Sequence, residues 1–296
     1  MNSHRHLLPA NLLITMMLFG ASSVVCQEVT PPTSSSANEQ KPTPLESVDV
    51  TAKREALRKE LTTFVSNVTI ADGSNTARWR EPICPSIVGT APEQGEFINA
   101  RIRETAKFAG APVGEAAKCT PNLLVFLTTQ PNELIAQLKA RYPKLFDNMT
   151  TDEITGAMPA AHPVRIWQRS TLKNADGSSP APTHRLKDSR IVGSVSEELD
   201  AVIIVVDTAS TGTVTFGQLS DYISMVALAQ VDLRAGLENA STILRLFAGK
   251  VQERPPGQMT DWDRAFLKAV YGLQDFNLRE PSVVTNRMLE YLDSQR

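Results

Sequence analysis

The chain has little of several residue types on which recognisable chemistry depends. Its 296 residues include 3 cysteines and 4 histidines, and aromatic residues make up only 6% of the sequence. No stretch approaches the roughly 20 consecutive apolar residues of a membrane-spanning helix. The 30 basic and 32 acidic residues nearly cancel, and the net charge is −2. Because no basic excess is available to neutralise phosphates, we expect no nucleic-acid partner.

The motifs of common catalytic sites are also missing. The sequence contains no H-E-x-x-H zinc motif, no G-x-S-x-G nucleophile turn and no G-x-x-x-x-G-K-[ST] phosphate loop. Only His162 and His184 follow the N-terminal segment, and His162 precedes Pro163, which is typical of a loop residue rather than a base. We therefore expect no bound metal and no cofactor.

Residues 1–26 are typical of an export signal. A weakly basic start is followed by the apolar run Leu12–Phe19 and then by small residues that suit cleavage. Cleavage is expected between Ser22 and Gln27, and lipid attachment at Cys26 is the alternative. We expect an exported protein, either periplasmic or secreted.

Two further regions follow the predicted signal. Residues 27–50 are rich in proline, serine and threonine and carry almost no large apolar side chains. Burial there could not offset the entropy of ordering the chain, so we predict a disordered linker. Residues 51–296 are predicted to form a single globular domain, because the 42% apolar and 21% charged content of the chain is close to that of globular proteins.

Helical and extended patterns alternate along this domain. Asn122–Thr128 is predicted to be a buried strand and Ala201–Val206 the strongest strand. Val164–Gln168 and Ile191–Val195 are predicted as shorter strands. The order α-β-α-β-α-β-β-β-α-α-α predicts an α+β domain with one mixed sheet.

One predicted helix is apolar nearly all round. Thr215 and Gln218 have the spacing of a capping box at its start. From Tyr222 to Ala229 only Ser224 is polar, and a helix of this kind is buried in a core. We therefore expect it at the centre of the domain, followed by C-terminal amphipathic helices.

Cys84 and Cys119 remain once the export signal is removed. In an oxidising compartment this pair is predicted to form a disulfide, which would close a loop of about 35 residues. Two buried free thiols are the alternative. A catalytic cysteine is disfavoured because its histidine would have to come from only two candidates.

The last third of the chain contains three segments in a suggestive order. The predicted helix at Asp221–Asp232 is followed by Ser241–Leu244 and by a helix that opens at Met259–Asp263 and closes on Val270-Tyr271. This order resembles metzincin-type zinc proteases, whose metal-binding helix precedes a tight turn and a helix that opens like L-T-x-x-D and closes on L-Y. It is also similar to a bacterial family of unknown function in which E-E-L-x-Q replaces the metal motif.

The departures from that pattern determine the chemistry that the resemblance implies. The two helix histidines fall on Asp221 and Met225, and the general-base glutamate falls on Tyr222. The third ligand falls on Val231 or Asp232. Methionine and valine do not replace imidazole at zinc, and one or two carboxylates form a poor zinc site. The resemblance therefore implies a zincin-like scaffold without zinc, whose candidate cleft consists of Asp221, Tyr222, Met225 and Asp232; an ordinary core helix is the alternative.

Two functions remain open at this point. The favoured prediction is a non-catalytic domain that binds an envelope protein or a peptide, and the alternative is a cell-envelope hydrolase that uses Asp221 and Asp232 with Tyr222. An enzyme needs Asp221 and Tyr222 at a solvent-filled cleft, whereas a scaffold would bury Tyr222 and Met225. The direction of this helix face therefore distinguishes the two functions.

The resemblance also implies where a peptide would lie. In zincins the peptide follows an edge strand that immediately precedes the strand leading into the central helix. The corresponding segment here gives a candidate peptide-binding edge at Arg190, Ile191, Val192 and Val195. Unpaired N–H and C=O groups on such an edge accept an extended chain, and Arg185 and Lys187 nearby favour an acidic or C-terminal segment. Protection of the edge against aggregation is the alternative role of these charges.

Overall fold

The computed structural model describes residues 44–69, 76–115, 118–146, 162–174, 178–179, 195–233, 236–248, 255–274 and 280–296. The predicted export signal, the first part of the predicted linker, and the residues Arg185 and Lys187 lie outside these ranges. Leu45–Arg296 forms one compact unit. Across the ranges given, no helix combines the length and the apolar character that crossing a membrane requires.

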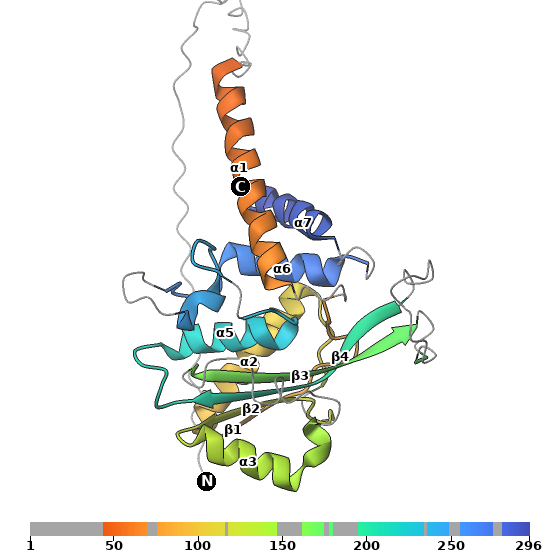
Figure 1. The fold of residues 1–296 in the computed structure, drawn as a ribbon, viewed down its shortest axis with the longest axis vertical. Coiled ribbons are helices and arrows are strands. Elements are labelled where there is room, and N and C mark those ends of the chain that lie inside the picture. Colours follow the sequence, from red (N-terminus) through yellow and green to blue (C-terminus); the bar gives the residue numbers. More distant parts are fainter. Residues whose placement is uncertain are drawn as a thin grey trace, which may run out of the picture. The chain divides into compact units, whose positions relative to one another are not determined.

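The secondary structure alternates between helices and strands (Figure 1). The helices are α1 (Pro44–Val68), α2 (Pro92–Ala109), α3 (Pro131–Arg141), α5 (Phe216–Leu228), α6 (Asp261–Gly272) and α7 (Pro281–Ser294), with 3-10 helices η1 (Pro143–Phe146) and η4 (Ile243–Phe247). The strands are β1 (Pro85–Val88), β2 (Leu123–Thr128), β3 (Val164–Asn174) and β4 (Val195–Asp207).

The four strands form one mixed sheet in the order β1-β2-β4-β3. β1, β2 and β4 are parallel, whereas β3 runs antiparallel to β4. Helix α2 connects the parallel strands β1 and β2, and the connection between the parallel strands β2 and β4 includes α3 and β3. The predicted α+β domain with a single mixed sheet is confirmed.

The sheet separates two hydrophobic cores because side chains alternate along each strand. On one face, Val202 and Ile204 of β4 pack in the main core with α2 and α5. On the other face, Ile203 and Val205 pack with Trp167 of β3 and with α3. Figure 1 shows α2 and α5 on one side of the sheet and α3 on the other, with α6 and α7 beyond α5. The apolar helix α5 is therefore central, as its sequence predicts.

β4 is longer than the sequence pattern indicates. One continuous strand from Val195 to Asp207 contains the predicted strand Ala201–Val206 and begins at the last residue of the one predicted at Ile191–Val195, whose other residues lie outside the described ranges. Between Arg169 and Ser170 of β3 the register shifts, which leaves Asp200 as an extra residue in β4. The polar residues before Ala201 concealed the strand because they lie in a two-stranded ribbon that extends past β2.

Helix α1 also begins earlier than expected. It starts at Pro44, so residues 44–50, which the sequence assigned to the linker, are helical. Proline suits the first turn of a helix, where its missing N–H leaves no bond unmade. Val50 is 64% exposed, whereas Leu61 and Phe64 are buried. The early turns thus extend a helix that is held by packing further along.

The capping boxes at the starts of α5 and α6 explain where these helices begin. The Gln218 N–H donates to Thr215 Oγ1 at 3.2 Å, and the Thr215 N–H donates to Gln218 Oε1 at 3.0 Å. Thr260 and Asp263 form the same arrangement at α6. The buried Asp263 carboxylate also accepts a bond from the Ile243 N–H at 2.8 Å, so it fixes η4 against α6.

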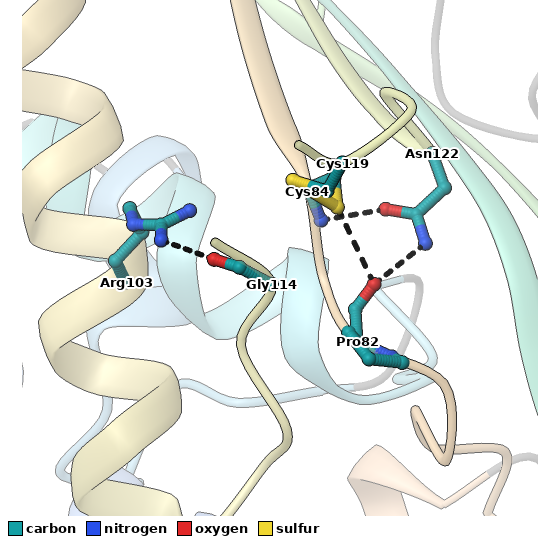
Figure 2. Close-up of a disulfide and its surroundings, with 6 residues drawn as sticks. All are labelled: Pro82, Cys84, Arg103, Gly114, Cys119 and Asn122. Carbon is teal, nitrogen blue, oxygen red and sulfur yellow. Dashed lines mark hydrogen bonds between the residues drawn. A yellow bond between two sulfur atoms is a disulfide. The ribbon is translucent and has the colours of Figure 1, made fainter. Parts of the chain in front are cut away.

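The predicted disulfide between Cys84 and Cys119 is present, with 5.9 Å between the two Cα atoms. Figure 2 shows Asn122 beside it, where its Oδ1 accepts the Cys84 N–H at 2.8 Å. Gly114 packs directly against the bridge, since a Cβ at this position would lie only 2.7 Å from Cys84 Sγ. The disulfide and Gly114 therefore form a tight junction between the start of β1 and the segment that leads into β2.

Candidate functional site

Asp221 lies on α5 and is almost completely buried, with 1% of the residue exposed. Its two carboxylate oxygens accept bonds from Arg101 Nε at 2.5 Å and Arg101 Nη2 at 3.2 Å. The Met259 N–H donates to the same carboxylate at 2.7 Å. The hydrogen bond with Asp221 raises the pKa of Arg101. Asp221 therefore joins α5 to α2 and to the segment before α6.

A cavity of about 350 Å³ lies beside this ion pair. Its walls include Phe97, Arg101, Glu104, Gly217, Asp221 and Gln258. The Arg101 side chain is 27% exposed and forms most of the contact with solvent, whereas the side chain of Asp221 is only 2% exposed. In this arrangement the carboxylate is neutralised by Arg101 and is poorly placed to act as a base or nucleophile.

Tyr222 is fully buried and does not line that cavity. Its ring lies 5.0 Å from that of Phe247 and 6.4 Å from that of His162, measured between centroids. Its hydroxyl has no hydrogen-bond partner within the described part of the chain. Burial raises the pKa of Tyr222. Aromatic packing therefore occupies the position at which the zincin pattern places a catalytic glutamate.

The other two residues of the predicted cleft do not meet Asp221 at a common opening. Met225 is fully buried on α5. Asp232 follows α5, and its N–H donates to the Val68 carbonyl at 2.8 Å. Neither residue lines the cavity beside Arg101. Among the residues that the structure describes, no three His, Cys, Asp or Glu side chains are grouped so that they could hold a metal ion.

A second cavity, of about 550 Å³, lies among α1, the start of α6 and the end of α7. Leu57, Trp262 and Leu292 contribute its apolar wall, and Asp261 and Arg296 are also at its surface. None of the residues that the sequence singled out for chemistry lines it.

His162 lies in the aromatic cluster around Tyr222, and the titration of its ring makes the stability of the fold depend on pH. Its Nδ1 lies 2.7 Å from the Val164 carbonyl oxygen, and its ring packs 5.6 Å from that of Phe247. Burial lowers the pKa of His162 from its usual 6.5, so the unfolded chain binds a proton more readily than the folded chain.

The unfolding free energy should therefore fall as the pH drops below neutrality through the lowered pKa of His162. Urea denaturation across this range measures the effect, with His162→Phe as the control because phenylalanine preserves the aromatic packing and does not titrate. An identical pH slope in the variant would assign the acid sensitivity to other groups.

The candidate peptide-binding edge predicted from the sequence lies mostly outside the described residues. Arg190, Ile191 and Val192 lie outside the described residues. Val195 begins β4, where it pairs with Asn174 of β3, and β2 joins β4 only from Val202 onward. The edge strand that precedes β4 is β3 (Val164–Asn174). Sequence periodicity underestimated the length of β3, because its second half, Arg169–Asn174, is mostly polar.

β3 presents main-chain groups along its outer side. In the described sheet β3 pairs only with β4, and the Asp207 N–H donates to the Pro163 carbonyl at 2.7 Å. Inward and outward residues alternate in an antiparallel ladder, so this bond directs the N–H groups of Ile166 and Gln168 away from β4. The Gln168 side chain donates to the Val226 carbonyl at 2.8 Å and thereby anchors β3 to the end of α5.

Comparison of the chain with models of known families, with curated proteins and with solved structures finds no match.

Proposed function

We propose that the protein is an exported, non-catalytic domain that binds an extended peptide or protein segment along β3. Its scaffold is zincin-like, but the two helix positions that would hold the metal are occupied by Asp221, which is paired with Arg101, and by the buried Met225. The observation that carries the proposal is the burial of Tyr222 and Met225 on α5, next to a long edge strand.

The packing of α5 favours binding over catalysis. An enzyme would need Asp221 and Tyr222 at one solvent-filled cleft, yet Asp221 is held by Arg101, and Phe247 packs against Tyr222. The alternative carboxylate hydrolase would also need Asp232, whose backbone is tied to the end of α1. The geometry therefore gives less support to a hydrolase than to a scaffold.

The sheet topology supports the zincin-like part of the proposal. The resemblance implies an edge strand, then the strand that leads into the central helix, then that helix. β3, β4 and α5 follow one another in this order, and β3 is the antiparallel strand at the end of the sheet.

The two edges of the sheet differ in a way that favours β3 as the binding edge. β1 has only 4 residues and begins with Pro85, which has no N–H to offer. β3 has 11 residues and no proline. Short strands and prolines are common protections of edges, so β3 is the edge that an extended chain can join.

The disulfide supports export. Disulfides persist in oxidising compartments and are rare in the reducing cytosol. The bridge between Cys84 and Cys119 thus agrees with the signal proposed for residues 1–26 and with a periplasmic or secreted location.

Blocking one outward N–H of β3 should strongly weaken peptide binding. Ile166→Pro removes the N–H of Ile166 from the free side of an edge strand, where proline is tolerated. We expect at least about tenfold weaker binding, because one backbone hydrogen bond is lost and the proline ring obstructs the incoming strand. A peptide selected from a random library on the wild-type chain serves as the probe in fluorescence anisotropy.

Ile166→Ala is the matched control, because it shortens the same side chain and keeps the N–H. It should bind the peptide with close to wild-type affinity, and circular dichroism should show both variants folded. Equal binding by folded proline and alanine variants would contradict the proposal, as would failure to select any peptide.

A further inference from the structure

We propose that the segment bound along β3 is acidic and carries carboxylates four residues apart, which meet Arg169 and Lys173. This inference rests on the proposed binding at the β3 edge and adds the chemistry of the partner.

Arg169 and Lys173 lie on the same face of β3. Trp167 packs in the core with α3, and Arg165 Nη1 donates to Asn132 Oδ1 of α3 at 2.5 Å. Side chains two apart share a face of a strand, and the extra residue at the bulge is in β4 and not in β3. Residues 165, 167, 169, 171 and 173 therefore all project to this face.

Within the described part of the chain, neither of these two cations has a partner. Both are partly exposed, and the structure gives neither an ion pair nor a hydrogen bond among the residues it describes. β3 itself contains no acidic residue. The nearby acids of β4 are engaged by hydroxyl groups, since Glu198 accepts from Ser196 at 3.0 Å and Asp200 accepts from Thr171.

The pair lies towards the end of β3, where the Asn174 N–H already donates to the Ser178 carbonyl at 2.8 Å, so an added strand would use the N–H groups of β3 before Asn174. β2 pairs with β4 only from Val202 to Asp207. Lys173 pairs with Ser196 and Arg169 with Ala201, so both lie where the β3–β4 ribbon continues past β2. Figure 1 shows this ribbon extending beyond the neighbouring strands.

The spacing of the two cations sets a register. Residues four apart on a strand are separated by about 13 Å, and a strand added beside β3 has the same repeat. Two glutamates four residues apart on the partner can therefore face Arg169 and Lys173 at once. Charges that only protect an edge from aggregation would show no such dependence on position.

Three peptides of the same length test this register. The first is a threonine- and valine-rich peptide with two glutamates four positions apart, the second has one of these glutamates moved by a single position, and the third has glutamines in their place. Binding is measured by fluorescence anisotropy to the wild-type chain and to the Arg169→Gln/Lys173→Gln variant. Lys59→Gln/Lys107→Gln removes the same charge from exposed positions on α1 and α2 and is the control.

We expect the wild-type chain to bind the first peptide about fivefold more tightly than either of the others. The preference should disappear in Arg169→Gln/Lys173→Gln, persist in the control variant and weaken at high salt. Loss of this preference to the same extent in both variants, or equal binding of the two acidic peptides by the wild-type chain, would contradict the proposed register. If peptides bind without preference and Ile166→Pro still strongly weakens binding, only this inference fails. If no peptide binds, the proposed function fails with it.

Discussion

Replacing Tyr222 with glutamate is expected to unfold the domain or to cost it at least about 4 kcal/mol of stability. The side chain is fully buried, and its ring packs against those of Phe247 and His162. A carboxyl group there would lose its hydration without gaining a positive partner, and the aromatic contacts would be lost. Urea denaturation followed by circular dichroism measures the change.

Tyr222→Phe is the matched control and should behave in the opposite way. It keeps the ring contacts and removes a buried hydroxyl that has no described hydrogen-bond partner. Removal of such a group should leave stability unchanged or raise it by about 1 kcal/mol. A stable Tyr222→Glu variant would mean that this position is open to water, as the hydrolase alternative requires.

Arg101→Met is expected to lower the unfolding free energy by about 3 kcal/mol. The change leaves the Asp221 carboxylate buried with a described bond only from the Met259 N–H. Because the cavity beside Arg101 admits some water, the loss should be at the lower end of that for a fully enclosed pair. Denaturant titration against the wild-type chain provides the measurement.

The double variant Arg101→Met/Asp221→Leu separates charge burial from packing. Replacing both partners with apolar side chains removes the uncompensated carboxylate, so most of the lost stability should return. If the double variant is less stable than Arg101→Met alone, the contribution of Asp221 lies mainly in its bond to Met259 and not in its charge.

Local signals predicted much of the fold. The capping box of Thr215 and Gln218 correctly predicted the start of α5, and the apolar run after Tyr222 correctly predicted its burial, whereas the helix ends at Leu228, before the predicted Asp232. The pairing of Cys84 with Cys119 followed from the small number of cysteines. Each of these features depends on residues that are close in sequence or few in number, so the sequence is compatible with few alternative structures.

The edge of the sheet was harder to predict because strand pairing is not local. Polar residues at Arg169–Asn174 and at Ser196–Asp200 concealed the ribbon in which each strand completes the hydrogen bonds of the other. The partner of Asp221 was also missed, since Arg101 is 120 positions earlier in the chain. A lone arginine between the apolar positions Ile98 and Ile102 of α2 was the one available signal.

The disulfide has a mechanical consequence for a chain that is pulled from its two ends. It closes a loop over a sequence separation of 35 residues, which contains all of β1 and α2. Under load the chain can lengthen only outside this loop, so its fully extended length is shorter by about 110 Å than that of the reduced chain. Even after the rest of the domain has been drawn out, β1 and α2 carry no tension, because the force passes directly from one sulfur to the other.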